Sequence, residues 1–225
     1  NLCSGSVRQL NNQITAERNV RFYAFALVSA HDLDMHNSRA WQMEWLKSQG
    51  FETVEYHMVT GASLDETMDY FEGKADQVAA LSEDEMPRVL HFLRVHEMTC
   101  YTGGMNPFIT TLEGGQNFTL PEDVTEPTME TILAYDPEII FLSNFDDVTP
   151  EDFYENRLEG QDWSNVSAVK NHKVYKVPCG LYRWAPPNTF EKPLYMKWTA
   201  SIVQPDIFSD YDIRTEISDF YKDYY

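Results

Sequence analysis

The chain has 225 residues, enough for one large domain or for two small lobes with separate hydrophobic cores. Its formal net charge of −19 repels phosphate backbones, so nucleic acid is not an expected partner and a cationic protein surface is a more natural one. No apolar run approaches the roughly 20 residues of a membrane-spanning helix, so we expect membrane contact only through a partner or a lipid anchor.

The N-terminal part predicts one β-α-β unit. Residues 20–29 read VRFYAFALVS, an apolar run rich in aromatic and β-branched side chains that is typical of a buried strand. A helix is expected through residue 47, because Asn37 or Ser38 can cap its start and Gly50 can end it. Residues 51–59 alternate as a second strand, which we expect to lie parallel to the first.

The remainder of the chain alternates helices with strands. Residues 63–81 predict a long amphipathic helix that opens on the capping-box pattern SLDE, and residues 89–95 predict a strand covered on both faces. Later helices are expected over residues 107–112 and 128–135, within 150–158, and over 190–203, with strands over 138–143 and 173–178. This order predicts an α/β fold of three-layer (αβα) lobes with largely parallel sheets.

The cysteines and histidines give no defensible metal site. Cys3, Cys100 and Cys179 lack the CxxC spacing of zinc sites, and a Cys100–Cys179 bridge is left open. The segment HDLDMH, residues 31–36, has suitable ligand types for a divalent metal, but its spacing matches no metal motif, and a polar loop is the favoured interpretation. His91 lies inside an apolar strand and is expected to be a core histidine.

Enzymatic motifs are not found. The sequence contains no nucleophile elbow, P-loop, dinucleotide-binding glycine pattern or HExxH. We therefore do not expect an enzyme. Two alternatives stay open: a metal-dependent α/β enzyme that uses the loop at residues 31–36, and a metallocofactor-binding chaperone without a transporter.

Three segments resemble one protein family. They are MPRVLHF at residues 86–92, METILAYDPEIIFL at residues 129–142, and residues 163–208, which begin WSNVSAVKNHKVYKVP and end WTASIVQPDIF. Together they resemble the C-terminal lobe of the class III solute-binding proteins, which serve ABC importers of iron-siderophores, haem and cobalamin. The resemblance implies a C-terminal lobe over residues 87–225 and a rigid linker helix over residues 63–86. The N-terminal part departs from the family pattern of a full sheet, because only one β-α-β unit is expected there, so residues 1–62 are predicted to be a partial or reduced N-terminal lobe.

The resemblance also implies a function. We expect an extracytoplasmic protein, periplasmic or at the cell surface, with a lipoprotein form left open. It would act as a monomer without an intrinsic cofactor, capture a metal complex and deliver it to an ABC transporter permease. A ferric siderophore or haem is the expected ligand; cobalamin and an oxyanion such as molybdate are also served by this family.

The ligand in this family lies between loops at the carboxyl ends of the strands. Here the C-lobe loops are residues 94–106, 144–148 and 180–187. Aromatic faces suit a chelate or macrocycle, and a guanidinium suits carboxylate or phosphate groups. The candidate ligand contacts are Tyr101, His96, Tyr182, Arg183 and Trp184. In the alternative reading, Tyr182 and Trp184 pack the lobe and only Arg183 faces solvent.

Glu130 is the candidate permease-docking residue. It matches the family glutamate that begins a helix on the outer rim of the C-lobe and pairs with arginines of the permease. A carboxylate in a first helical turn is also stabilised by the helix dipole, which is the simpler explanation of the same residue.

Overall fold

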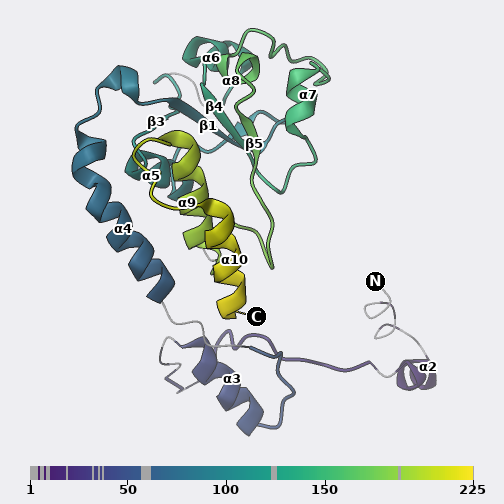
Figure 1. The fold of residues 1–225 in the computed structure, drawn as a ribbon. Helices are drawn as coiled ribbons and strands as arrows, with labels where there is room; N and C mark the ends of the chain where they lie inside the picture. Colours follow the sequence, from purple (N-terminus) through teal and green to yellow (C-terminus); the bar gives the residue numbers. More distant parts are fainter. Residues whose placement is uncertain are drawn as a thin grey trace. The chain divides into compact units, whose positions relative to one another are not determined.

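The structure, a computed structural model, describes residues 5, 8, 11–18, 20–31, 33–34, 36, 38–56, 62–122, 126–186 and 189–224 (Figure 1). The chain divides into two compact units, residues 1–60 and residues 61–225. Each unit is described by itself.

In the first unit the structure describes the helices α2 (Asn12–Glu17) and α3 (Arg39–Ser48). Ser38 caps α3 as predicted, because its side chain accepts a hydrogen bond from the Trp41 amide at 3.3 Å. Gly50 follows the helix with φ of 88°, a left-handed conformation that favours glycine. The buried core of this unit consists of Ala24, Met43 and Leu46.

The two strands predicted in this unit are reduced to one parallel bridge between Ala24 and Thr53. The apolar side chains around Ala24 are not buried: Phe25 is 76% exposed and Val28 is 88% exposed. A pair of strands with no third strand and little packing is marginal in water, which explains why a strand-like sequence does not form a ladder here. The last residues of the second predicted strand, 57–59, lie outside the described residues.

The second unit is built on a five-stranded sheet. Its strands are β1 (Arg88–Arg94), β2 (Thr99–Cys100), β3 (Gln116–Asn117), β4 (Ile139–Leu142) and β5 (Val174–Lys176). The order is β2-β1-β4-β5, with β3 also paired to β1. Only β2 is antiparallel to its neighbour, and the β1–β4 register runs from Val89 opposite Ile139 to Phe92 opposite Leu142.

Helices cover both faces of this sheet (Figure 1). One core contains α4 (Ala62–Ala79), α5 (Met105–Leu112), α9 (Lys192–Val203) and α10 (Ile213–Tyr224) with one face of β1 and β4. The other core contains α6 (Met129–Tyr135), α7 (Pro150–Tyr154) and α8 (Ser167–Lys170) with the opposite face. A short 3-10 turn, η1 (Glu83–Glu85), precedes β1. The predicted three-layer α/β fold is confirmed for this unit.

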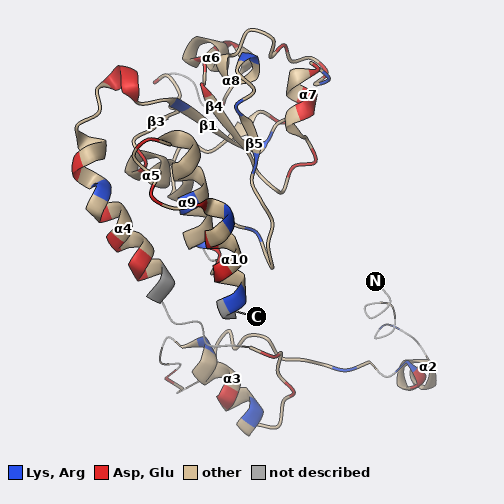
Figure 2. Cartoon of the chain, in the orientation of Figure 1, with Lys and Arg blue, Asp and Glu red and all other residues tan. Residues whose placement is uncertain are grey.

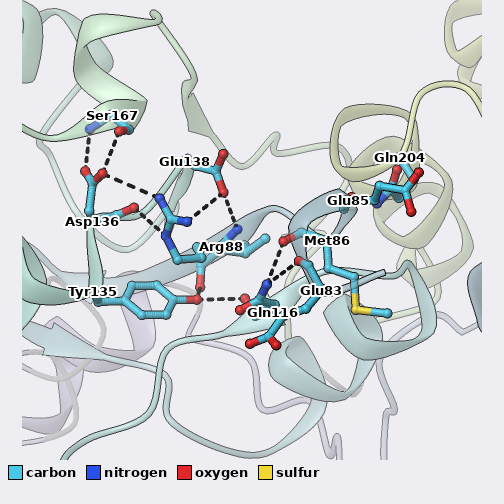
Figure 3. Close-up of polar contacts among 11 residues, drawn as sticks. Glu83, Glu85, Met86, Arg88, Gln116, Tyr135, Asp136, Glu138, Ser167 and Gln204 are labelled. Atoms are coloured by element: carbon cyan, nitrogen blue, oxygen red, sulfur yellow. Dashed lines mark hydrogen bonds and ion pairs between the residues drawn. The ribbon is translucent and has the colours of Figure 1, made fainter. Parts of the chain in front are cut away.

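Polar side chains join the strands where β1 and β4 begin (Figure 3). Arg88 donates from Nε to the carbonyl of Asp136 at 2.9 Å, and its guanidinium lies 3.4 Å from the Glu138 carboxylate. Asp136 in turn accepts from the amide of Ser167 at 2.8 Å, which ties in the start of α8.

A second set of bonds fixes β3 at the same end of the sheet (Figure 3). Gln116 donates from Nε2 to the carbonyls of Glu83 and Met86, at 2.8 and 2.9 Å. The hydroxyl of Tyr135 donates to the carbonyl of Gln116 at 2.8 Å. These contacts secure one end of the sheet and leave the opposite, carboxyl-terminal end to the longer loops.

Strand β5 forms an edge of the sheet, and one side chain covers part of it. The hydroxyl of Tyr154, in α7, accepts from the amide of Val174 at 3.1 Å and donates to the carbonyl of the same residue at 3.2 Å. Both backbone groups of Val174 are therefore satisfied without another strand.

Candidate functional site

A hollow of about 390 Å³ lies at the carboxyl ends of the central strands. The end of β1 and the segments that follow β2, β4 and β5 all contribute to its lining. Its lining includes Tyr101, Gly103, Gly104, Asn106, Phe145 and Pro186. Ligands of open α/β sheets bind at this edge, so the hollow is the candidate ligand site.

The floor of the hollow is formed where α5 begins. Gly104 precedes the helix with φ of 86° and ψ of −156°, a conformation that side chains rarely allow, so glycine shapes this turn. Asn106 is only 6% exposed, and its Oδ1 has no hydrogen-bond partner among the residues that the structure describes. A buried polar atom of this kind at the floor suits a site that is completed by water or by a ligand.

His91 lies beneath this floor as a core residue, as predicted. It is 4% exposed, its Nε2 is 2.8 Å from the Thr110 hydroxyl, and its ring stacks on Phe141 with centroids 5.0 Å apart. Burial lowers the pKa of His91 to about 3, so the imidazole is neutral at physiological pH.

Arg183 stands beside the hollow and is partly buried. Its guanidinium carbon lies 3.8 Å from the centroid of the Phe145 ring and 6.0 Å from that of Tyr182. The backbone of Phe145 is in turn held by Arg94, which donates to its carbonyl oxygen. Phe145 was not among the ligand contacts predicted from the sequence. The only sequence signal for it is its position just after a buried strand.

Trp184 and Tyr182 take opposite positions, although they are two residues apart. Trp184 is 2% exposed, donates from Nε1 to the hydroxyl of Tyr221 at 3.2 Å, and packs edge-on against Trp198. Its ring belongs to the core, as the packing alternative proposed. Tyr182 is 50% exposed, so that alternative does not describe it.

Tyr101 and His96, the other two candidate ligand contacts, also differ in their position relative to the hollow. Tyr101 is partly buried, lines the hollow, and donates its amide to the carbonyl of His91 at 2.9 Å; burial raises the pKa of its phenol. His96 is exposed in the turn after β1 and is not among the residues that line the hollow. Tyr101 and Phe145 thus line the hollow, and Arg183 contacts Phe145 from the neighbouring loop together with Tyr182.

Glu130 lies on a different surface. It is exposed in the first turn of α6, which Thr128 and Thr131 cap reciprocally. A second, open hollow of about 640 Å³ adjoins it and includes Thr119, Pro121 and Tyr135 in its lining. The carboxylate is therefore accessible from solvent.

The described residues contain no group of three or more His, Cys, Asp or Glu side chains that could hold a metal ion. In the loop at residues 31–36, His36 lies 3.5 Å from the Asp34 carboxylate, while Asp32 and Met35 are outside the described residues.

Cys100 and Cys179 are both free, so the bridge left open is not formed, and burial raises the pKa of Cys100 to about 12. No described helix is long and apolar enough to cross a membrane.

Solved structures of binding proteins share this fold. A periplasmic solute-binding protein of Veillonella parvula superposes with a TM-score of 0.66 and 35% identity, over 79% of this chain and 60% of that protein. The predicted resemblance is confirmed. The molybdate-binding protein MolA of Haemophilus influenzae is 26% identical over 126 residues, which are 56% of this chain and 32% of MolA. The chain thus spans 60% or less of these two binding proteins.

The N-terminal residues are similar to a different class of protein. Residues 1–84 match the adenylation domain of NAD-dependent DNA ligases. A DNA ligase of Ruminiclostridium cellulolyticum is 56% identical over 71 residues, which are 32% of this chain and 11% of the ligase. The match ends just before β1 and includes α4. The reduced N-lobe over residues 1–62 and the linker role of residues 63–86 therefore stay predictions.

Proposed function

We propose that the chain supplies the C-terminal ligand-holding lobe of an extracytoplasmic solute-binding protein, which captures a small metal-containing solute and delivers it to an ABC permease. The hollow at the carboxyl ends of β1 and β4 carries the proposal, since it lies in a lobe with the fold of solute-binding proteins. Glycine turns give a ligand access to backbone, and Tyr101 and Arg183 supply polar groups. The chain would act by binding and release and not as an enzyme.

The site chemistry favours an anionic ligand with apolar surface. Arg183 brings a cation that is already stacked on an aromatic ring, Tyr101 supplies a phenol in the lining of the hollow, and Tyr182 directly precedes Arg183 in the loop. A ferric siderophore or haem meets both requirements and is the proposed ligand. Molybdate is the second candidate, because the similarity to MolA favours it.

The remaining properties follow from this function. We place the protein in the periplasm or at the cell surface, with membrane contact only through its permease or a lipid anchor, and acting as a monomer. Its acidic character suits a cationic docking partner: Figure 2 shows Asp and Glu positions in red along α4 and at η1 in the second unit.

Replacing Arg183 tests the site. Arg183→Ala removes a charge-assisted interaction and is expected to weaken binding by about 1.5 to 3 kcal/mol, or roughly 10- to 150-fold. The measurement is titration calorimetry with haemin, a ferric tricatecholate complex and molybdate. Arg157→Ala is the matched control, because Arg157 pairs with Glu155 on the surface after α7. Equal affinity of Arg183→Ala and the unmodified chain would refute the assignment, and no binding of any probe would refute the proposed function.

A further inference from the structure

The loop that carries Arg183 is held by one buried carboxylate. Glu191 is completely buried at the start of α9. Its Oε1 accepts from the amide of Leu181 at 2.7 Å and its Oε2 from the amide of Tyr182 at 2.9 Å. Tyr221, in α10, donates its hydroxyl to the same carboxylate. Three donors thus converge on Glu191, and each bond gains from the carboxylate charge.

Two neighbours extend this arrangement along the loop. The hydroxyl of Tyr221 also accepts from Trp184 Nε1, and Lys192, next to Glu191, donates to the carbonyl of Ala185. Residues 181, 182, 184 and 185 are therefore each tied to α9 or α10. Among the described residues, a bridge between residues 179 and 183, a bond between residues 180 and 182, and a bond from the amide of residue 189 to the carbonyl of residue 186 add to these ties.

The packing around Glu191 leaves no room at the start of the loop. A Cβ on Gly180 would lie 1.9 Å from Glu191 Oε1 and 1.6 Å from the hydroxyl oxygen of Tyr221. Glycine at this position lets the backbone pass directly over the carboxylate. A side chain larger than that of glycine at position 180 would therefore clash with both Glu191 and Tyr221.

We propose that Glu191 and Tyr221 are positioning residues, which hold residues 180–186 so that the Arg183 guanidinium stays on the Phe145 ring beside the hollow. The role of Arg183 in this inference rests on the proposed function. The claim that Glu191 and Tyr221 fix the shape of the loop is independent of that function. Without the carboxylate, two adjacent amides would lose their shared acceptor, and the segment would keep few bonds that fix Arg183.

Amide exchange tests the loop directly. In Glu191→Gln and in the milder Tyr221→Phe, the amides of Leu181 and Tyr182 should exchange with solvent at least about tenfold faster by NMR. Tyr211→Phe is the matched control, because the hydroxyl of Tyr211 donates to the backbone carbonyl of Lys197 in α9, outside the loop. If these two amides exchange in both variants at the same rate as in the control, the proposal is overturned.

Binding tests the link to Arg183. With molybdate, haemin and the ferric tricatecholate complex as probes, Glu191→Gln should weaken whichever probe binds by about tenfold. Arg183→Ala combined with Glu191→Gln should bind no more weakly than Arg183→Ala alone, because residues that act through one group are not additive. Additive losses would overturn the link. If no probe binds the unmodified chain, the proposed function fails, while the exchange measurement still decides the positioning role.

Discussion

Glu113 has an environment unlike that of an ordinary carboxylate. It is fully buried after α5, and Thr199 donates to its Oε1. Within the described part of the chain, its Oε2 and the buried hydroxyl of Tyr195 have no hydrogen-bond partner. Burial raises the pKa of Glu113 well above the ordinary 4.5, so the folded protein binds this proton more tightly than the unfolded chain does.

The pH dependence of stability follows from that proton. The protonated Glu113 contributes fully to the free energy of unfolding below the pKa that this carboxyl has in the unfolded chain. As the pH rises from there toward its pKa in the folded protein, the contribution is lost by up to roughly 1.4 kcal/mol per pH unit. Glu113→Gln keeps the neutral shape and cannot ionise. Its melting temperature should therefore exceed that of the unmodified chain by an amount that grows from about pH 5 to about pH 8. Calorimetric scans at several pH values measure this difference, and a difference that stays constant across this pH range would contradict the assignment.

At the scale of elements, most of the second unit could be predicted because burial imposes regular patterns. Strands β1 and β4 read as apolar runs since helices cover both faces. Helix α4 was predicted from its apolar spacing, but it begins at Ala62, so Ser63 lies inside the helix and is not its cap. The two-residue strands β2 and β3 were not predicted, because such short pairs leave no periodicity. Helix α10 was also missed, although Ile213, Ile217 and Phe220 follow helical spacing.

The site was less predictable because its loops are irregular. Side-chain direction follows the sequence in a strand or helix, but not in residues 180–186, where Tyr182 points outward and Trp184 inward. Glu191 gave no local signal, since its partners lie up to 30 residues away. Such contacts depend on how α9 and α10 pack together.

Helix α6 carries the docking prediction. Glu130→Ala should leave ligand affinity and folding unchanged while lowering permease-dependent uptake by about three- to tenfold, more at low ionic strength, because an exposed charge mainly steers association. Uptake into vesicles that hold the cognate permease measures the effect. Glu151→Ala is the control, an exposed carboxylate in the first turn of α7. Equal uptake by the two variants would leave Glu130 only its role at the helix terminus.

At the scale of the whole molecule, the two units differ in the amount of buried core. The first buries Ala24, Met43 and Leu46, whereas the second has two clusters of fifteen buried residues each. Helix α4 belongs to the second unit, where Phe71 packs against Phe208 with ring centroids 5.1 Å apart. Stability should therefore reside in the second unit.

Truncation tests this distribution. A chain of residues 62–225 should unfold cooperatively within about 4 °C of the full chain by circular dichroism. A shorter chain that starts at residue 84 should melt at a clearly lower temperature, because removing α4 uncovers the core around Phe208 and takes away the buried Phe71. Loss of cooperative unfolding in residues 62–225 would show that the first unit contributes to the stability of the second.

The hydroxyl of Tyr154 has a consequence for the protein in concentrated solution. An open sheet edge offers unpaired amides and carbonyls to any passing strand, and so favours self-association and fibre growth. Strand β5 has three residues, and the phenol of Tyr154 already occupies both backbone groups of Val174. An incoming chain would have to displace that phenol before it could begin a ladder. A single oxygen atom thus acts as a barrier to templated aggregation at this edge of the sheet.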